Sequence, residues 1–166
     1  ITYKEIFALL KADKMWLGNG FKAGNAYFAS PLSKDYADGV YDKETGLVKF
    51  RNCCWYTNLD HGKRHQPLAL MTMKDNLKFS KHKDIKENGY QNYDNYNAIE
   101  VSYTDAIPSD YDGVMGVPIS FLDKYSPEQF EIVGSDYEVK EGKLPEIVNP
   151  NWQGKLDRGY INGNRI

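Results

Sequence analysis

The run CCWYTNLDHGKRHQPL, residues 53–68, concentrates side chains that can react or can bind nucleic acid. Two adjacent cysteines and two aromatic residues precede an amide, two histidines and two strong bases. Three kinds of chemistry use such residues: metal coordination, thiol catalysis and nucleic-acid binding. Each of them requires a different spacing of its side chains.

The spacing disfavours a metal site, although Cys53, Cys54, His61 and His65 are all ligand types. Zinc sites space their cysteines by two to four residues, whereas adjacent side chains on a strand point to opposite faces. A cysteine nucleophile is equally disfavoured, because no oxyanion loop or partner acid is identifiable. The two cysteines are better explained as small, soft residues on the core side of a strand.

Nucleic-acid binding fits this run better than metal or thiol chemistry. Aromatic faces stack on bases, which is the role we assign to Trp55 and Tyr56. Cationic side chains neutralise phosphates, and the candidates for that role are His61, Lys63, Arg64 and His65. From the residues alone, a core tryptophan followed by a solvated basic loop is the stronger alternative.

Charge is distributed unevenly along the chain, although the formal net charge is only −2. Residues 61–87 contain seven lysines and arginines against three acids, and residues 123–146 contain seven acids against three bases. Such separation indicates a polarised surface. The near-neutral total gives no general signal of a nucleic-acid partner, and two solvated faces of opposite sign would explain the counts equally well.

The elements around residues 53–68 are predicted from hydrophobic periodicity and turn signals. A helix is expected over residues 2–14, with short strands at 14–20, 25–30, 96–102 and 129–135, and one strand or a hairpin at 47–57. Residues 33–46 and 136–159 are polar and turn-rich, and 61–89 is expected to be a surface segment or a partly ordered linker. Asn162 and Gly163 predict a hairpin turn, whose partner strand we expect to lie beyond Ile166.

These patterns give an α/β or α+β protein with a boundary near residues 75–92. No apolar run approaches the roughly 20 residues of a membrane span. Two adjacent cysteines are a poor arrangement for a structural disulfide, so a cytoplasmic protein is expected. Because the chain starts at Ile1 and enters a helical pattern at once, we expect a piece of a longer protein.

Four blocks of the sequence together resemble the EcoRI-type adenine-specific DNA methyltransferase family. They are ITYKEIFALLKADKMWLG, WYTNLDHGKRHQPL, YDNYNAIEV and IPSDYDGVMGVPISFLDKYSPEQFEIVG. The blocks follow the order of the family and cover most of the chain.

The resemblance implies a bacterial restriction–modification enzyme that moves a methyl group from S-adenosylmethionine to the exocyclic amine of adenine in duplex DNA. Such enzymes flip the target base out of the stack. The family's Asn-Pro-Pro-Phe catalytic motif and its glycine-rich cofactor motif are absent here. The chain would therefore be the C-terminal half, inactive alone, with the cofactor bound mainly by the missing N-terminal half.

The implied fold is α/β. Residues 1–80 would form the last strands of a partial Rossmann-like methyltransferase sheet, as the C-terminal part of the catalytic domain. Residues 81–166 would form an α+β, β-rich target-recognition region. A monomer is expected, or a dimer formed through the unfinished sheet edge of the fragment.

Transferred residue by residue, the resemblance places Trp55 and Tyr56 on the flipped adenine, with Asn58 as a hydrogen-bonding group. Lys63 and Arg64 would hold nearby phosphates. Two alternatives from other classes stay open. One is a stand-alone nucleic-acid-binding module without catalysis, and the other is an interaction domain whose basic stretch is merely solvated.

Overall fold

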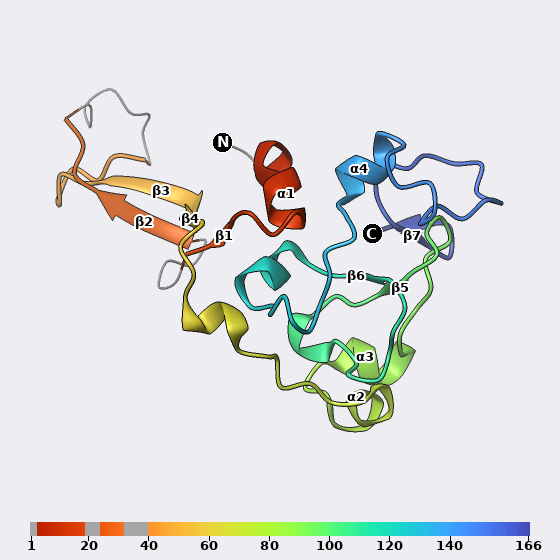
Figure 1. Cartoon of the computed structure of the whole chain (residues 1–166). Helices are drawn as coiled ribbons and strands as arrows, with labels where there is room; N and C mark the ends of the chain where they lie inside the picture. Colours follow the sequence, from red (N-terminus) through yellow and green to blue (C-terminus); the bar gives the residue numbers. More distant parts are fainter. Residues whose placement is uncertain (1–2, 19–23, 32–39) are drawn as a thin grey trace. The chain divides into compact units, whose positions relative to one another are not determined.

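The computed structural model of the chain describes residues 3–18, 24–31 and 40–166 (Figure 1). The chain forms two compact units: unit 1 consists of residues 1–14 and 62–166, and unit 2 of residues 15–61. In the described residues the α-helices are α1 (Tyr3–Lys11), α2 (Met73–Phe79), α3 (Lys83–Asn88) and α4 (Asp136–Lys140). The 3₁₀ helices are η2 (Gly62–His65), η3 (Thr104–Ala106) and η4 (Ile119–Asp123).

The described strands are short and pair two by two. They are β1 (Trp16–Leu17), β2 (Gly24–Phe28), β3 (Val48–Cys53), β4 (Tyr56–Thr57), β5 (Ile99–Glu100), β6 (Met115–Gly116), β7 (Tyr160–Ile161) and β8 (Asn164–Arg165). The pairs β1–β4, β2–β3 and β7–β8 are antiparallel, and β5–β6 is parallel. The protein is therefore mixed α/β, as predicted, but its described strands form four separate two-stranded sheets.

Unit 2 consists of the two antiparallel pairs β1–β4 and β2–β3. The register of the second pair shifts between Gly24 and Ala26, and β3 ends two residues before the tryptophan of the aromatic run. The turn before β3 is closed by Asp42, whose carboxylate accepts hydrogen bonds from Thr45 Oγ1 at 2.8 Å and from the Glu44 amide at 2.9 Å. These bonds lower the pKa of Asp42, with the Thr45 hydroxyl as the larger cause.

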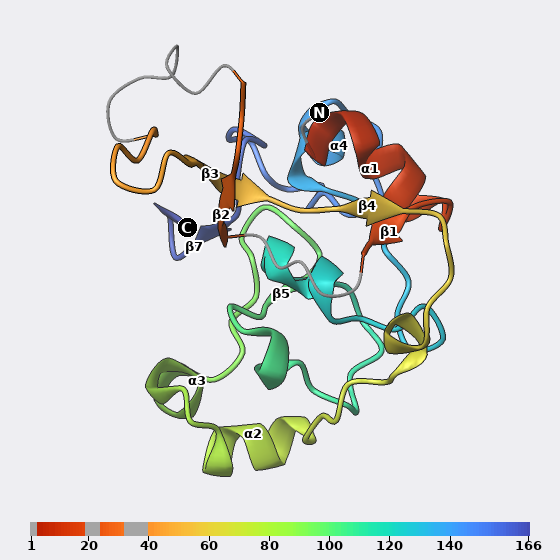
Figure 2. The same ribbon diagram turned by 90° about the vertical axis from the view of Figure 1, so that its left-hand side faces the viewer.

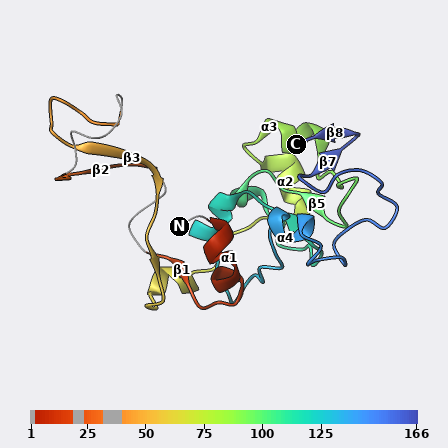
Figure 3. The same cartoon turned by 90° about the horizontal axis from the view of Figure 1, so that it is seen from above.

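Unit 1 packs helices and loops around several small groups of buried apolar side chains. Helix α1 buries Ile6, Phe7 and Leu10, which recur at helical spacing on one face. Beside α4, a cluster of Val139, Leu144 and Ile147 packs against partly buried neighbours. The helices α2 and α3 lie side by side in each view (Figures 1, 2 and 3).

The buried amide of Asn95 joins three segments of unit 1. This residue is fully buried, and its Nδ2 donates to the Arg158 carbonyl at 2.7 Å. Its Oδ1 accepts from the Tyr160 amide at 3.0 Å, and its backbone carbonyl accepts from the Asn149 amide at 2.9 Å. Residues 95, 149 and 158–160 are thereby fixed to one another without a continuous sheet.

The C-terminal hairpin closes within the chain, so the expectation of a partner strand beyond Ile166 was wrong. Tyr160 pairs with Arg165 and Ile161 with Asn164 (Figure 3). The turn residues Asn162 and Gly163 have φ values of 51° and 74°. These values suit a type I′ turn, which is what the Asn-Gly pair predicted.

Three other predictions of local structure need correction. Residues 61–89 contain η2, α2 and α3 where a surface segment or linker was expected. Residues 129–135 form no strand, and residues 136–140 form α4. Two of the three missed helices, α2 and α4, start at side-chain caps: Thr72 accepts from the Asp75 amide, and Ser135 with Glu138 forms a capping box. Helices of five to seven residues are too short to show a clear hydrophobic period.

Replacing Asn95 by alanine should lower the unfolding free energy by about 2 to 4 kcal/mol, because two buried backbone groups lose their partner. Urea denaturation of the purified protein measures this. The matched control is Asn92→Ala, since Asn92 is exposed and its side chain forms no hydrogen bond with the described residues. The control should change the free energy by less than about 0.5 kcal/mol, and equal stability of the two variants would contradict the role of Asn95.

Candidate nucleic-acid interface

The aromatic residues predicted to hold a base lie at the start of β4 in unit 2. Strand β4 pairs with β1, so that Leu17 faces Tyr56 and Trp16 faces Thr57. The amide of Gly18 donates to the Trp55 carbonyl at 2.8 Å. Trp55 is 60% exposed while Tyr56 is half-buried, as expected for side chains that alternate along extended backbone. A large exposed aromatic face beside a fixed strand is suited to stacking.

The segment after β4 is held back onto β1 by polar contacts. The indole Nε1 of Trp16 donates to the Leu59 carbonyl at 3.0 Å. The Leu59 amide donates to Thr57 Oγ1 at 3.0 Å, and His61 Nε2 lies 3.1 Å from the Leu17 carbonyl oxygen. Asn58, the predicted hydrogen-bonding group, is exposed in this same segment. Unit 2 therefore brings together Trp55, Tyr56, Asn58 and His61 on a short, anchored stretch.

The remaining predicted phosphate-binding residues belong to η2 in unit 1, and each has a carboxylate partner. Lys63 Nζ lies 3.8 Å from Asp123 Oδ1. Arg64 forms an ion pair with Asp13, just after α1, and its side chain is only 10% exposed. His65 Nδ1 lies 2.5 Å from Glu128 Oε1. The partner of Arg64 lies 51 residues away in the sequence, and that of His65 lies 63 residues away. The sequence alone therefore did not reveal these partners.

The contacts of His65 do not form a nucleophilic triad. Ser126 Oγ donates to the second oxygen of Glu128, so the carboxylate lies between the hydroxyl and the imidazole. A serine nucleophile needs the imidazole as its direct base. The hydrogen bond from Ser126, followed by that from His65, lowers the pKa of Glu128 to about 2. The arrangement fixes η2 against the segment that follows η4.

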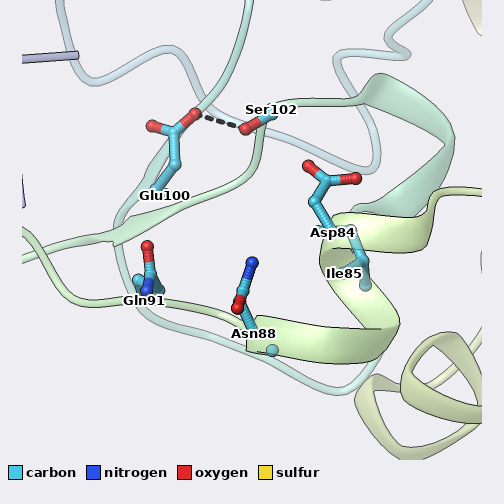
Figure 4. A pocket seen from close by; sticks show the side chains of 7 residues that line it. Asp84, Ile85, Asn88, Gln91, Glu100 and Ser102 are labelled. Carbon is cyan, nitrogen blue, oxygen red and sulfur yellow. Dashed lines mark hydrogen bonds between the residues drawn. The ribbon is translucent and has the colours of Figure 1, made fainter.

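A small polar hollow in unit 1 lies between α3 and β5 (Figure 4). Its volume is about 60 Å³, and its lining includes Asp84, Asn88, Gln91, Glu100 and Ser102. Ser102 Oγ donates to Glu100 Oε1 at 2.9 Å, and the hydroxyl of Tyr93 donates to the other oxygen. Since a cavity that holds benzene has about 150 Å³, this hollow is too small for a purine.

Tyr93 reaches Glu100 because two glycines leave room for its ring. A Cβ at Gly116 or Gly159 would overlap the Tyr93 ring. Burial is the main cause that raises the pKa of Tyr93 far above its usual range, followed by the hydrogen bond to Glu100. The Tyr/Asn-rich stretch from residue 90 to 97 thus contributes internal packing and hydrogen bonds around Tyr93 and Asn95.

The described residues include no group of three or more histidine, cysteine, aspartate or glutamate side chains arranged to hold a metal ion. Cys54 is a half-buried free thiol, and the side chain of Cys53 lies outside the described part of the chain. No helix in the described ranges is long and apolar enough to cross a bilayer.

Comparison with known proteins identifies the family. The sequence model of the family described as adenine-specific methyltransferase EcoRI matches residues 1–162. The chain therefore belongs to the EcoRI-type adenine-specific methyltransferase family, as the sequence blocks indicated.

Two curated relatives show the extent of the likeness. The Type II methyltransferase M.EcoRI of Escherichia coli is 42% identical over 136 residues, which cover 80% of this chain and 39% of that protein. The Type II methyltransferase M.MgeORF184P of Mycoplasma genitalium is 32% identical over 180 residues, which cover 99% of this chain and 51% of that protein. The chain thus spans about half the length of these relatives or less. No solved structure matches the chain.

The contacts of Glu128 with Ser126 and His65 predict that the unfolding free energy depends on pH. Because the pKa of Glu128 is lowered from 4.5 to about 2 in the folded protein, its contribution is fully present above about pH 4.5 and is lost as the pH falls through about 2. Between these values the unfolding free energy should fall less steeply in Glu128→Gln than in the unchanged protein. Denaturant titrations at a series of pH values measure both slopes.

The control for this measurement is Glu131→Gln. Glu131 is exposed, and among the residues that the structure describes it has no ion pair or side-chain hydrogen bond. This variant should follow the unchanged protein between pH 4.5 and 2. Parallel curves for Glu128→Gln and the unchanged protein would show that the contacts of Glu128 with Ser126 and His65 do not favour its ionised form.

Proposed function

We propose that this chain is part of a site-specific DNA adenine methyltransferase of a restriction–modification system. The complete protein transfers a methyl group from S-adenosylmethionine to the exocyclic amine of an adenine in duplex DNA. The match of the family model over residues 1–162 carries this proposal, supported by 42% identity to M.EcoRI. In this protein, residues 1–80 serve the catalytic domain and residues 81–166 serve target recognition.

The aromatic stretch of unit 2 supplies the contact to the flipped adenine. Trp55 offers an exposed ring and Tyr56 a half-buried one, both on backbone that is paired with β1. Stacking on such rings tolerates any base, so it captures the adenine without choosing the site. The exposed amide of Asn58 lies two residues further on and provides a hydrogen bond to the base edge.

The bases that follow provide contacts to nearby phosphates. The side chains of Lys63 and His65 are 36% and 38% exposed, so both can contact a phosphate while remaining near their carboxylate partners. Arg64 is nearly buried in its pair with Asp13. A phosphate would have to replace that carboxylate, which makes Arg64 the most costly of the three contacts. His61, close to the Leu17 carbonyl, completes the proposed set.

Neither the hollow beside α3 nor the motifs of this sequence fit S-adenosylmethionine. The hollow beside α3 is too small for it, and the sequence contains no Asn-Pro-Pro-Phe motif and no Gly-x-Gly-x-x-Gly motif. We therefore assign cofactor binding and alignment of the adenine amine to other segments of the complete protein. The short strands of residues 1–80 would extend its Rossmann-like sheet.

Methyl transfer tests this function directly. The complete protein that contains this chain should transfer labelled methyl groups from S-adenosylmethionine to an adenine amine at a fixed short sequence, as mapped on duplex DNA. Residues 1–166 alone should transfer none. Failure of the folded complete protein to label DNA would contradict the proposal, and labelling by residues 1–166 alone would contradict the assignment of catalysis to other segments.

Replacing Trp55 or Tyr56 by alanine in the complete protein should slow methyl transfer about 5-fold to 150-fold, since base stacking contributes about 1 to 3 kcal/mol. Trp55→Phe and Tyr56→Phe keep an aromatic face and should retain most of the rate. Single-turnover kinetics separate this loss from product release. Tyr137→Ala is the matched control, because Tyr137 is 51% exposed on α4. Rates near normal for both alanine variants would exclude the assignment of Trp55 and Tyr56 to stacking on the flipped adenine.

A further inference from the structure

A second basic surface lies on the helical pair α2–α3 of unit 1. All five lysines of residues 73–88 are exposed: Lys74, Lys78, Lys81, Lys83 and Lys86. The aromatic ring of Phe79 is 62% exposed, and Lys78 Nζ lies 4.9 Å from its centre. We call these six residues the α2–α3 surface. This surface lies outside the four segments that resemble the family, and the proposed contact of Trp55, Tyr56 and Asn58 with the adenine does not include it.

The scaffold under the α2–α3 surface is fixed by buried contacts. Asn76 is fully buried, and its Nδ2 lies 3.4 Å from both the Met71 and the Ala106 carbonyl oxygens. The Met73 amide donates to Asp110 Oδ1 at 2.7 Å. On α3, Ile85 is 4% exposed. The helical pair is therefore anchored to the loops around η3.

Helical geometry places lysines away from this anchor. Lys74 and Lys78 lie two residues before and two residues after Asn76, which is about 200° around an α-helix. Both therefore lie on the face opposite the buried amide, one turn apart. Lys86 follows the buried Ile85 by one residue, about 100° around α3.

The lysines of the α2–α3 surface differ from the bases of η2 in their charge balance. Lys81 pairs with Asp105 at 2.6 Å and Lys83 with Glu87 at 3.4 Å. In the described part of the chain, no carboxylate forms an ion pair with Lys74, Lys78 or Lys86. The bases of η2 are each paired with an acid. Three exposed lysines without an ion pair in these ranges, on a fixed scaffold, are what a polyanion would contact.

We propose that the α2–α3 surface binds the sugar–phosphate backbone of duplex DNA through Lys74, Lys78 and Lys86. This inference rests on the proposed function, and it adds a second phosphate contact to that of η2. Duplex DNA carries one negative charge per about 1.7 Å of helix axis. Lysines one helical turn apart, about 5 to 6 Å at their Cβ atoms, each meet phosphates of such a polyanion. The exposed ring of Phe79 provides an apolar contact for deoxyribose.

The acidic stretch of a second copy is a poorer occupant for this surface. Several carboxylates of residues 123–146 are already engaged within the chain: Asp123 with Lys63, Glu128 with His65, Glu138 with Lys11, and Glu141 with Lys143. A second copy would have to give up these four pairs to bring the whole acidic stretch to the lysines. DNA phosphates carry no such competing partners beyond their mobile counterions.

Salt-dependent DNA binding tests the inference. Lys74→Gln/Lys78→Gln/Lys86→Gln in the complete protein should bind duplex DNA more weakly by a similar factor on every sequence. The slope of log K against log salt should become shallower by about 3, or about 1 per lost phosphate contact. Fluorescence anisotropy of a labelled duplex with and without the methylation site measures both. The Lys→Arg triple variant keeps the charges and should keep the slope.

The matched control is Lys124→Gln/Lys140→Gln/Lys155→Gln, which removes three exposed lysines from elsewhere in unit 1. Its slope should equal that of the unchanged protein. If the α2–α3 variant also keeps the unchanged slope while methyl transfer persists, the inference is wrong and the proposed function stands. A complete protein that binds no DNA would overturn both. Loss of a salt-sensitive dimer in the α2–α3 variant, with the DNA slope unchanged, would assign the surface to a second copy.

Discussion

Side-chain amides, some buried and some exposed, hold unit 1 together in place of long strands. Its strands are two residues long, so few backbone groups are satisfied by sheet ladders, yet buried backbone groups must still find partners. Asn95 bonds to the backbone of residues 158 and 160, and Asn149 Nδ2 donates to the Asp94 carbonyl at 2.8 Å. Gln129 bonds both backbone groups of Leu68. Each amide supplies a donor and an acceptor in one plane, which lets it replace a missing neighbouring strand.

Contacts with distant residues also determine how much positive charge the η2 bases present. The basic cluster of residues 63–65 was predicted from its composition, but its partners come from two distant segments: Asp13 after α1, and Asp123 and Glu128 at and after the end of η4. These pairs make η2 a junction between the end of α1 and the loops on either side of residue 125. A cluster of bases in a sequence therefore does not measure the positive charge that a surface offers. That charge depends on which carboxylates the fold brings back. Each base of η2 has such a carboxylate, whereas Lys74, Lys78 and Lys86 form no ion pair within the described residues.

The sequence predicted those elements whose cause is local. The 3.6-residue period of Ile6, Phe7 and Leu10 gave α1, and the Asn162–Gly163 pair gave the C-terminal turn. Strand β3 fell within the predicted alternating run. The helices α2 and α3 were missed because their stability comes from a cap and from burial of Asn76 and Ile85 by distant loops. For the candidate site, the family resemblance nominated the aromatic residues, while the ion-pair partners required the fold, since loops fold back over more than 50 residues.

The buried amides and the α2–α3 surface are linked by a single requirement, that the cations be held in place before DNA arrives. Ordering a lysine-bearing segment at the moment of binding would cost conformational entropy for every residue fixed. Asn76 removes that cost because it fixes α2 to the loop at Ala106 in the free protein. Asn76 is buried on one face of α2, and Lys74 and Lys78 lie on the opposite face. From the sequence, Asn76 was expected to belong to a surface segment or linker. In the structure this amide holds the backbone that carries the neighbouring lysines.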